Sequence, residues 1–260
     1  MMKKDIKYEI NKRNWTREEE IIVFNLYCKI PFKNSSKNHP EVIKIANLIN
    51  RTPSSVNMKI GNFGSFDPYL KAQGIVGLSN ASKLDKEVWD EFNNNWEKLV
   101  YESEKLLYKY SSKANSDIII PEGEERIVEA KQRVNQKFFR HAVLASYNNC
   151  CCITGLSNKE LLIASHIKPW KNSNPSEKTN PRNGICLNAL HDKAFDKGYI
   201  TVDKNYIIHI SNDIRDVFCG ETVNIYFKKY NNTKIMLPDK FLPAADFLTY
   251  HNDVIFENWR

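Results

Sequence analysis

Three stretches decide the fold of the second half of the chain: Cys150-Cys-Cys-Ile-Thr-Gly-Leu156, Leu161-Leu-Ile-Ala-Ser-His-Ile-Lys-Pro-Trp170 and Asn183-Gly-Ile-Cys-Leu-Asn-Ala-Leu-His-Asp-Lys-Ala-Phe-Asp196. An apolar run that ends at His166 predicts a strand, which Pro169 ends. A second apolar run is followed by residues of helical spacing that carry His191. Strand, loop, strand and helix, with one histidine on the first strand and one on the helix, indicate a compact metal site.

Three polar residues in this region have a characteristic order and spacing. His166 is followed by Asn183 seventeen positions on, and by His191 eight positions further. Together with the flanking words Ala-Ser-His-Ile-Lys-Pro-Trp and Asn-Ala-Leu-His-Asp-Lys-Ala-Phe-Asp, they resemble the HNH (ββα-metal) nuclease family. Within it, the wording is similar to bacterial restriction-type endonucleases. The upstream stretch Arg133–Arg140 extends the resemblance to roughly residues 122–211.

The resemblance implies a role for each of the three residues. Hydrolysis of a phosphodiester requires an activated water and a cation that neutralises the charge developing on the phosphate. By the resemblance, His166 is the general base, a role that suits a neutral histidine. His191 is the metal ligand supplied by the helix, and Asn183 braces the loop so that His166 is correctly oriented. The implied cofactor is a divalent metal ion, Mg²⁺ or Mn²⁺.

The sequence departs from the family pattern at the metal. Many members carry an acidic ligand immediately before the base histidine, where this chain has Ser165. Serine is a poor metal ligand, so the candidate ligands are His191, Ser165 and Asn188. The metal either rests on His191 with waters and phosphate oxygens, or recruits a neighbour such as Asn188 or Asp196. Many members also have a zinc site made of two Cys-x-x-Cys pairs. Because Thr154-Gly155 and Asn188-Ala189 stand where partner cysteines would be, no structural zinc is expected. The histidines without a supporting constellation are expected to be structural: His39, His141, His209 and His251.

Length and composition limit the class of protein. The 260 residues suffice for one large or two ordinary domains. Six cysteines, three of them consecutive, do not indicate a disulfide framework. No apolar run approaches the ~20 residues of a membrane helix, and the N-terminal lysines precede no apolar signal segment. We therefore expect a cytoplasmic protein without a membrane partner.

The positive charge is unevenly distributed. Lys and Arg outnumber Asp and Glu by twelve to six in residues 1–66 and by nine to two in residues 131–183. Residues 71–130 have the opposite balance, eight to twelve. Two basic segments favour two surfaces that bind a polyanion, here double-stranded DNA. Solvated charge without a partner is the alternative.

The N-terminal segment predicts three helices. Thr16 and Glu19 form a capping box for the first helix, and Pro40 begins the second. A short turn and Pro53 then precede a third helix, Ser54–Asn62, which gives a helix-turn-helix-like arrangement. A small helical bundle that only contacts the rest of the chain is the alternative. The side chains expected to face DNA from the third helix are Ser54, Ser55, Asn57 and Lys59.

Further elements follow from the apolar spacing. An amphipathic pattern from Leu84 to Tyr110 indicates a spacer, an interdomain brace or a dimer helix. Ile118–Ile120 predicts a short strand, and Glu124–Tyr147 predicts a helix with one basic side. Alternation in Tyr199–Ile210 predicts a β-hairpin. The phosphate contacts expected in this half come from Arg133, Lys137, Arg140 and Lys168.

These features together predict a two-domain α+β protein. Residues 1–75 form a helix-turn-helix-like DNA-reading domain, residues 76–121 a helical linker, and residues 122–260 a ββα-metal nuclease domain. The expected activity is metal-dependent hydrolysis of DNA phosphodiesters by a restriction endonuclease, with modified DNA as a candidate target. The alternatives are a catalytically weak or inactive DNA-binding protein on the same scaffold, or a homing or nicking endonuclease. A homodimer is compatible with double-strand cleavage.

Overall fold

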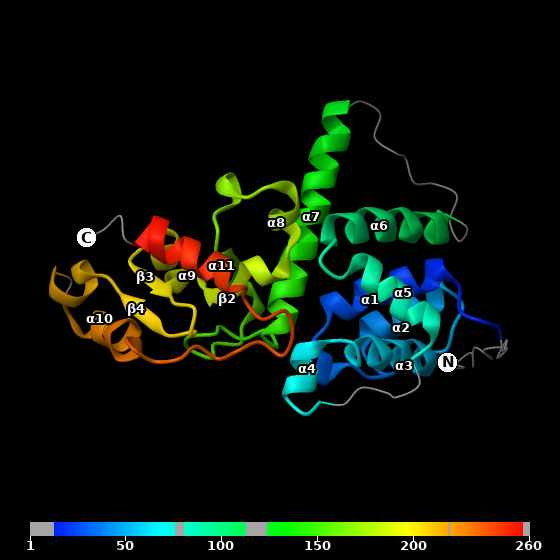
Figure 1. Cartoon of the computed structure of the whole chain (residues 1–260), viewed down its shortest axis with the longest axis horizontal. Helices are drawn as coiled ribbons and strands as arrows, with labels where there is room; N and C mark the ends of the chain where they lie inside the picture. Colours follow the sequence, from blue (N-terminus) through cyan, green and yellow to red (C-terminus); the bar gives the residue numbers. More distant parts are fainter. Residues whose placement is uncertain (1–12, 76–80, 113–123, 218, 257–260) are drawn as a thin grey trace, which may run out of the picture. The chain divides into compact units, whose positions relative to one another are not determined.

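The structure is a computed structural model that describes residues 13–75, 81–112, 124–217 and 219–256. The chain divides into two compact units, Met1–Lys131 and Gln132–Arg260. In Figure 1 the first unit runs from blue to green and the second from green to red. No helix of the described residues is both long enough and apolar enough to cross a membrane.

The first unit consists of helices arranged around α1 (Arg17–Lys29), as Figure 1 shows. The predicted capping box of α1 is confirmed, because Thr16 and Glu19 each bond the other's backbone N–H. α1 contacts four of the other helices: α2, α3, α5 and α6. The remaining helices of the unit are α2 (Pro40–Leu48), α3 (Pro53–Gly64), α4 (Pro68–Ala72), α5 (Lys83–Phe92), α6 (Trp96–Ser112) and the short 3₁₀ helix Phe32–Asn34.

Aromatic side chains form the centre of the first unit. The ring of Phe24 on α1 lies 4.9 Å from that of Phe63 on α3 and 5.4 Å from that of Trp89 on α5. Tyr27 and Trp96 complete the cluster, and both are fully buried. Because these rings come from four helices, the first unit has one continuous core.

The stretch predicted as a helical linker lies within this unit. Its amphipathic pattern is divided into α5 and α6 by three asparagines, the middle one of which, Asn94, has a φ of 74°. Asparagine tolerates this left-handed conformation better than most residues, so the helix ends there. α6 packs against α1, where the amide of Asn25 bonds the hydroxyl of Ser103. The predicted strand Ile118–Ile120 lies outside the described residues.

The second unit combines a long helix with two small antiparallel sheets, which confirms the α+β class. α7 extends over Glu124–Ser146 and leads into this unit, in agreement with the predicted helix. The predicted β-hairpin is also confirmed, as β3 and β4. The regular elements are β1 (Leu162–His166), α8 (Pro175–Thr179), β2 (Gly184–Asn188), α9 (Ala189–Asp196), β3 (Ile200–Val202), β4 (Ile208–Ile210), α10 (Glu221–Tyr226) and α11 (Ala245–Tyr250). The unit also contains short 3₁₀ turns at Lys159–Leu161, Trp170–Asn172, Pro181–Asn183 and Lys228–Tyr230. It has π-helical turns at Asp213–Val217 and His251–Phe256.

The strand, loop, strand and helix order predicted around His166 is formed by β1, β2 and α9. β1 and β2 are antiparallel with Ser165 opposite Ile185 and His166 opposite Gly184. A Cβ atom on Gly184 would come within 2.4 Å of Val143 and 2.8 Å of Phe139. Strand β2 therefore lies directly against α7, and only glycine leaves room for this approach.

Candidate active site

His166 stands at the end of β1 with its ring packed between aromatic side chains. The Phe139 ring of α7 is stacked on it, with centroids 3.7 Å apart, and Trp170 meets it edge-on at 5.4 Å. The Nε2 atom lies 3.1 Å from the carbonyl oxygen of Lys178. Since a carbonyl can only accept, Nε2 carries the proton, and the neutral ring keeps a lone pair on Nδ1.

The protonation state of His166 follows from its surroundings. Burial lowers the pKa of His166 to about 4, although the hydrogen bond to the Lys178 carbonyl acts in the opposite direction. The imidazole is therefore neutral near pH 7. No described residue hydrogen-bonds Nδ1 of His166. The ring borders a cavity of about 310 Å³ whose other walls include Gln136 and Arg140 of α7. A neutral imidazole beside an open space is suited to accept a proton from a water.

Asn183 is fully buried and connects both ends of the loop that separates β1 from β2. Its Oδ1 accepts from the Lys168 backbone N–H at 2.8 Å. Its Nδ2 reaches the carbonyl of Lys168 at 3.3 Å and that of Glu177 at 3.2 Å. Glu177 directly precedes Lys178, whose carbonyl holds His166. Asn183 therefore holds the loop that supplies the Lys178 carbonyl, and its role in orienting His166 for catalysis stays a prediction.

Ser165, next to the histidine, faces α9 instead of α7. Its hydroxyl is buried but makes no hydrogen bond of ordinary geometry with a described residue. It lies close to the carboxyl group of Asp192. Burial raises the pKa of Asp192, the Ser165 hydroxyl lowers it, and the charge of Asp196 raises it again. Burial also raises the pKa of Asp196. Asp192 thus interacts with both the Ser165 hydroxyl and the Asp196 carboxylate, and all three side chains offer oxygen atoms that could ligate a metal.

This oxygen group fits a hard divalent cation. Mg²⁺ is commonly bound by one or two carboxylates and completes its shell with water and substrate phosphate. Ser165, Asp192 and Asp196 meet that description, and a cation would offset the partial burial of Asp192, whereas Asp196 is exposed. Within the described residues, no three His, Cys, Asp or Glu side chains converge to hold a metal.

His191 and Asn188, by contrast, are engaged with each other. His191 is 1% exposed, and its Nε2–H donates to the Tyr226 carbonyl at 2.6 Å. Its Nδ1 accepts from Asn188 Nδ2 at 2.8 Å, and Asn188 Oδ1 accepts from the His191 backbone N–H at 3.0 Å. Neither ring nitrogen of His191 has a free lone pair for a metal. In this arrangement the pair caps α9 and ties it to α10, and ligation of the metal by His191 and Asn188 stays a prediction.

The region in which many family members have a zinc site contains a hydrogen-bonded cluster in this chain. Asn188 Nδ2 lies 3.7 Å from the sulfur of Cys151 and 3.3 Å from the hydroxyl of Thr154. Burial alone would raise the pKa of Cys151, but hydrogen bonds with His191 and Thr154 lower it to about 7. All six cysteines are free thiols. Cys151, Thr154, Asn188 and His191 thus satisfy one another at the start of α9.

The basic residues predicted to contact phosphate differ in availability. Arg133, Lys137 and Arg140 of α7 are exposed, and Arg140 borders the His166 cavity. Arg140 also donates to the Lys159 carbonyl at 3.2 Å. Lys168 is bound by both carboxylate oxygens of Glu177, at 2.8 and 2.9 Å. Its charge is therefore largely neutralised before any phosphate approaches.

The predicted DNA-facing residues of α3 are divided between surface and interior. Ser54 is exposed, and Ser55 and Asn57 are partly exposed. Lys59 is 6% exposed, and its ammonium lies 2.8 Å from Glu20 and 2.5 Å from Asp85. The predicted outward position of Lys59 is wrong, because two buried carboxylates bind it in the core.

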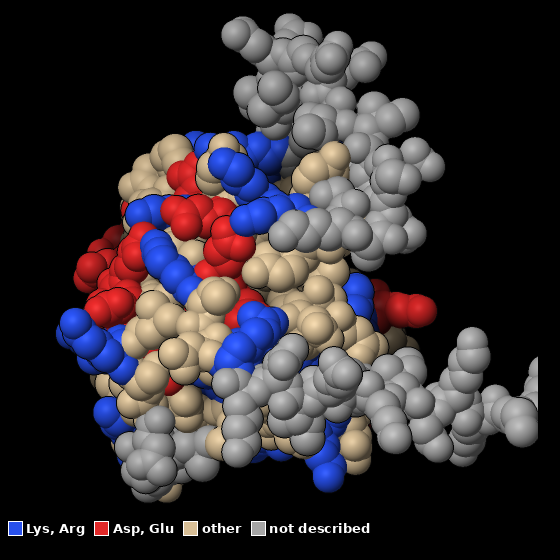
Figure 2. Space-filling model, turned by 90° about the vertical axis from the view of Figure 1, so that its right-hand side faces the viewer, with Lys and Arg blue, Asp and Glu red and all other residues tan. Residues whose placement is uncertain are grey.

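On the face in Figure 2, the coloured acidic and basic side chains are interspersed.

Sequence reasoning did not select Asp192 as a candidate metal ligand. The available signal was the spacing of Asp192 and Asp196, since residues four apart lie on the same face of a helix. The stack of Phe139 on His166 and the hydrogen bond to the Lys178 carbonyl had no such signal, because the first depends on the packing of α7 and the second on how the loop folds back.

One comparison with known proteins bears on this site. Residues 151–203 match the family model described as HNH endonuclease. The matched segment contains β1, β2, α9 and β3, and therefore His166, Asn183 and the pair Asp192 and Asp196. No significant match is found among curated proteins. The match supports a nuclease of the HNH type, which implies DNA as substrate and, as for such nucleases in general, a divalent metal ion.

Proposed function

We propose that the chain is a metal-dependent DNA endonuclease in which His166 is the general base. The observation that carries the proposal is the state of His166 within the segment that matches HNH endonucleases. The ring is neutral, its Nε2–H is fixed by the Lys178 carbonyl, and its Nδ1 lone pair remains free at a cavity.

The residues around His166 divide the chemical work. Nδ1 of His166 accepts the proton of a water that attacks the phosphorus atom. Phe139 and the Lys178 carbonyl hold the ring in one orientation, and Asn183 holds the loop that supplies that carbonyl. Arg140 and Lys137 bind backbone phosphates and position the strand to be cut.

Ser165, Asp192 and Asp196 would hold the divalent cation, Mg²⁺ or Mn²⁺. When bound, the cation neutralises charge that develops on the scissile phosphate and its leaving oxygen. Asp192 and Asp196 take over the part that we first expected of His191. His191 acts in this proposal as a positioning residue, because it fixes the N-terminal turn of the helix that carries both carboxylates.

The finer assignment is a cytoplasmic restriction endonuclease for double-stranded DNA, directed at modified bases. Its support is the restriction-type wording around His166 and the presence of a separate helical unit. In that unit α2, a turn with Asn50 at a φ of 52°, and α3 have the connectivity of a helix-turn-helix. Ser54, Ser55 and Asn57 would contact DNA from α3. Cleavage of both strands would require a homodimer or two successive cuts.

The decisive test is cleavage of plasmid and of modified phage DNA with Mg²⁺ or Mn²⁺. Wild type is compared with His166→Ala, and His141→Ala, an exposed histidine of α7, is the matched control. We expect metal-dependent cutting that falls at least 100-fold in His166→Ala and persists in the control. Loss of cutting in neither variant would refute the role of His166.

A DNA-binding protein without nuclease activity is the second candidate. The observation in its favour is that both ring nitrogens of His191 are occupied. Calorimetric titration with Mn²⁺ separates the two candidates. An active site of the proposed kind binds Mn²⁺ through Asp192 and Asp196, and the double variant Asp192→Asn with Asp196→Asn loses that binding. DNA binding without any heat of Mn²⁺ binding would favour the inactive protein.

A further inference from the structure

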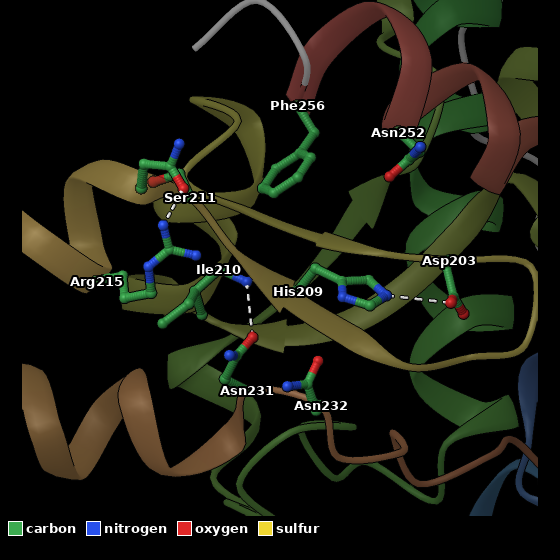
Figure 3. Close-up of a pocket in the computed structure, with 10 residues that line it drawn as sticks. Asp203, His209, Ile210, Ser211, Arg215, Asn231, Asn232, Asn252 and Phe256 are labelled. Carbon is green, nitrogen blue, oxygen red and sulfur yellow. Dashed lines mark hydrogen bonds and ion pairs between the residues drawn. The ribbon is translucent and has the colours of Figure 1, made fainter. Parts of the chain in front are cut away.

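The second unit contains a cavity of about 500 Å³ that the proposed nuclease chemistry does not use. The cavity is open to solvent. It lies beside the β3–β4 hairpin, which carries the labelled residues Asp203, His209 and Ile210 in Figure 3. Its walls come from β4, from the turn at Asn231 and Asn232, and from the π-helical turn His251–Phe256. A cavity of this size accommodates one nucleotide or a molecule of similar volume.

One wall presents a histidine whose orientation is fixed. Nε2 of His209 donates to the carboxylate of Asp203 at 3.1 Å. The other carboxylate oxygen of Asp203 accepts the backbone N–H groups of Asn205 and Ile207 at 2.8 and 2.9 Å. With Asp203 held by the backbone, the Nδ1 atom of His209 has no described partner, and Figure 3 shows the ring at the cavity.

Asparagine amides supply donors and acceptors around the same space. Asn231 uses its Oδ1 to accept from the Ile210 backbone N–H at 3.2 Å, which leaves its NH₂ group without a described partner. Asn232 is held through its backbone, which donates to the Ile208 carbonyl at 2.8 Å. No described residue bonds the side chain of Asn232. Each carboxamide can both donate and accept, as the edge of a nucleobase does.

An aromatic ring closes the cavity from the C-terminal side. Phe256 points towards the space in Figure 3 and is half-buried. The turn that carries it is anchored at its other end by His251. The His251 ring is stacked on Phe195 with centroids 3.6 Å apart and bonds Thr201 at 2.8 Å and the Phe195 carbonyl at 3.1 Å. Phe256 is thereby held opposite the polar wall.

The charges in the cavity do not favour an anion. The guanidinium of Arg215 bonds the carboxylate of Asp216 at 3.1 Å and the amide oxygen of Asn212 at 2.7 Å. Asp203 contributes a second carboxylate next to His209. A ligand that suits the cavity is therefore neutral, planar and rich in hydrogen-bonding groups, with a face that can stack on an aromatic ring.

We propose that this cavity binds a nucleobase, stacked on Phe256 and read along its edge by Asn231, Asn232 and His209. The inference rests on the proposed function in one respect, because a nuclease brings DNA to this unit. A base turned out of the duplex would then be recognised here, as enzymes that act on or inspect single bases do. A free nucleoside would use the same contacts.

The test measures binding of nucleosides to the full chain without metal, by saturation-transfer NMR and competition. Adenosine, guanosine, cytidine, thymidine and 5-methylcytidine serve as probes. Wild type is compared with Asn232→Asp and Phe256→Ala. Asn232→Asp removes the amide donors while it keeps the shape, and aspartate tolerates the φ of 59° at this position. The matched control is Asn224→Asp, an exposed asparagine of α10 in the same unit.

We expect binding of at least one nucleoside that weakens five-fold or more in both cavity variants and is unchanged in the control. No binding at millimolar concentration, or equal binding by all four proteins, would overturn the proposal. A duplex with one 2-aminopurine distinguishes the source of the base. Its fluorescence rises on binding to wild type but not to Phe256→Ala if the base comes from DNA, whereas a signal with nucleosides alone identifies a free ligand.

Failure of this inference is distinguishable from failure of the nuclease proposal. A chain that cuts DNA in a His166-dependent manner but binds no nucleoside keeps its proposed function and loses the base cavity. A chain that binds nucleosides through Asn232 and Phe256 but never cuts DNA keeps the cavity and loses the nuclease.

Discussion

Three histidines of the second unit, partly buried His166 and buried His191 and His251, show how one residue type serves different purposes. His166 keeps a free Nδ1 at a cavity, whereas both ring nitrogens of His191 and of His251 are hydrogen-bonded. The difference lies in the neighbours that each ring meets. Of the three, only His166 has a ring nitrogen without a described partner, and the other two connect elements.

His251 makes the second unit sensitive to acid. Burial lowers the pKa of His251 from 6.5 to about 4, so the unfolded chain binds more protons between these pH values. Stability is therefore complete above pH 6.5 and falls as the pH is lowered towards 4, by at most about 1.4 kcal/mol per pH unit. His251→Gln keeps a donor for the Phe195 carbonyl but does not titrate. We expect this variant to be less stable at pH 7 and to lose less stability between pH 7 and 5.

Amide hydrogen exchange of β3 and α11 at a series of pH values measures this effect. His166 also titrates with a lowered pKa, so some pH dependence will remain in His251→Gln. A dependence identical to that of wild type would contradict the assignment.

At the scale of the element, α3 is anchored to α1 and α5 by Lys59, a lysine that the sequence predicts to face solvent. Lys59 is bound between Glu20 of α1 and Asp85 of α5, and Asn62 donates to Asp85 at 2.9 Å. Lys59→Met leaves two buried carboxylates without their cation. We expect the first unit to lose about 3 kcal/mol of unfolding free energy.

Denaturant unfolding followed by tryptophan fluorescence measures this loss, since Trp89 and Trp96 lie in the core of the first unit. Lys44→Met, an exposed lysine on α2, is the control and should change stability by no more than ~0.5 kcal/mol. DNA affinity of folded Lys59→Met should equal that of wild type. A stable variant with weakened DNA binding would restore the surface role of Lys59.

At the scale of the whole molecule, the salt dependence of DNA binding reports which basic residues meet phosphate. Lys137 is exposed and no described residue pairs with it, whereas Lys168 is already bound by Glu177. We expect Lys137→Ala to reduce the slope of log affinity against log salt by about 0.9, and Lys168→Ala to change it little. Fluorescence anisotropy with a labelled duplex between 50 and 200 mM salt provides the slopes. Equal changes in both variants would show that the Lys168–Glu177 pair opens on DNA.

Local patterns sufficed to predict much of this molecule. The capping box at Thr16, the helix start at Pro53 and the β3–β4 hairpin depend on residues a few positions apart, and all three are present. The order of β1, β2 and α9 was likewise encoded in apolar runs. Such features need no knowledge of tertiary contacts.

Predictions that depended on tertiary contacts were less successful. Lysine is usually a surface residue, so the sequence predicts an exposed Lys59. Only the packing of α1, α3 and α5 brings the carboxylates of Glu20 and Asp85 to its buried ammonium group. The engagement of His191 by Asn188 and by Tyr226, 35 residues away, was equally invisible in the spacing. Sequence spacing identified where the site lies, while the direction of each side chain was set by partners from elsewhere in the chain.

Because β1 pairs with β2, the loop between the two strands should tolerate inserted residues, whereas the strands themselves should not. Ser165 and His166 are consecutive, so one turns towards α9 and the other towards α7. An insertion in the exposed part of the loop after Trp170 would lengthen a surface excursion and leave both directions intact. A single residue inserted within β1 would exchange the two faces, which would direct the imidazole towards the carboxylates and the hydroxyl towards Phe139. Protein engineers could therefore graft new segments between the strands, but could not edit the strands by one residue.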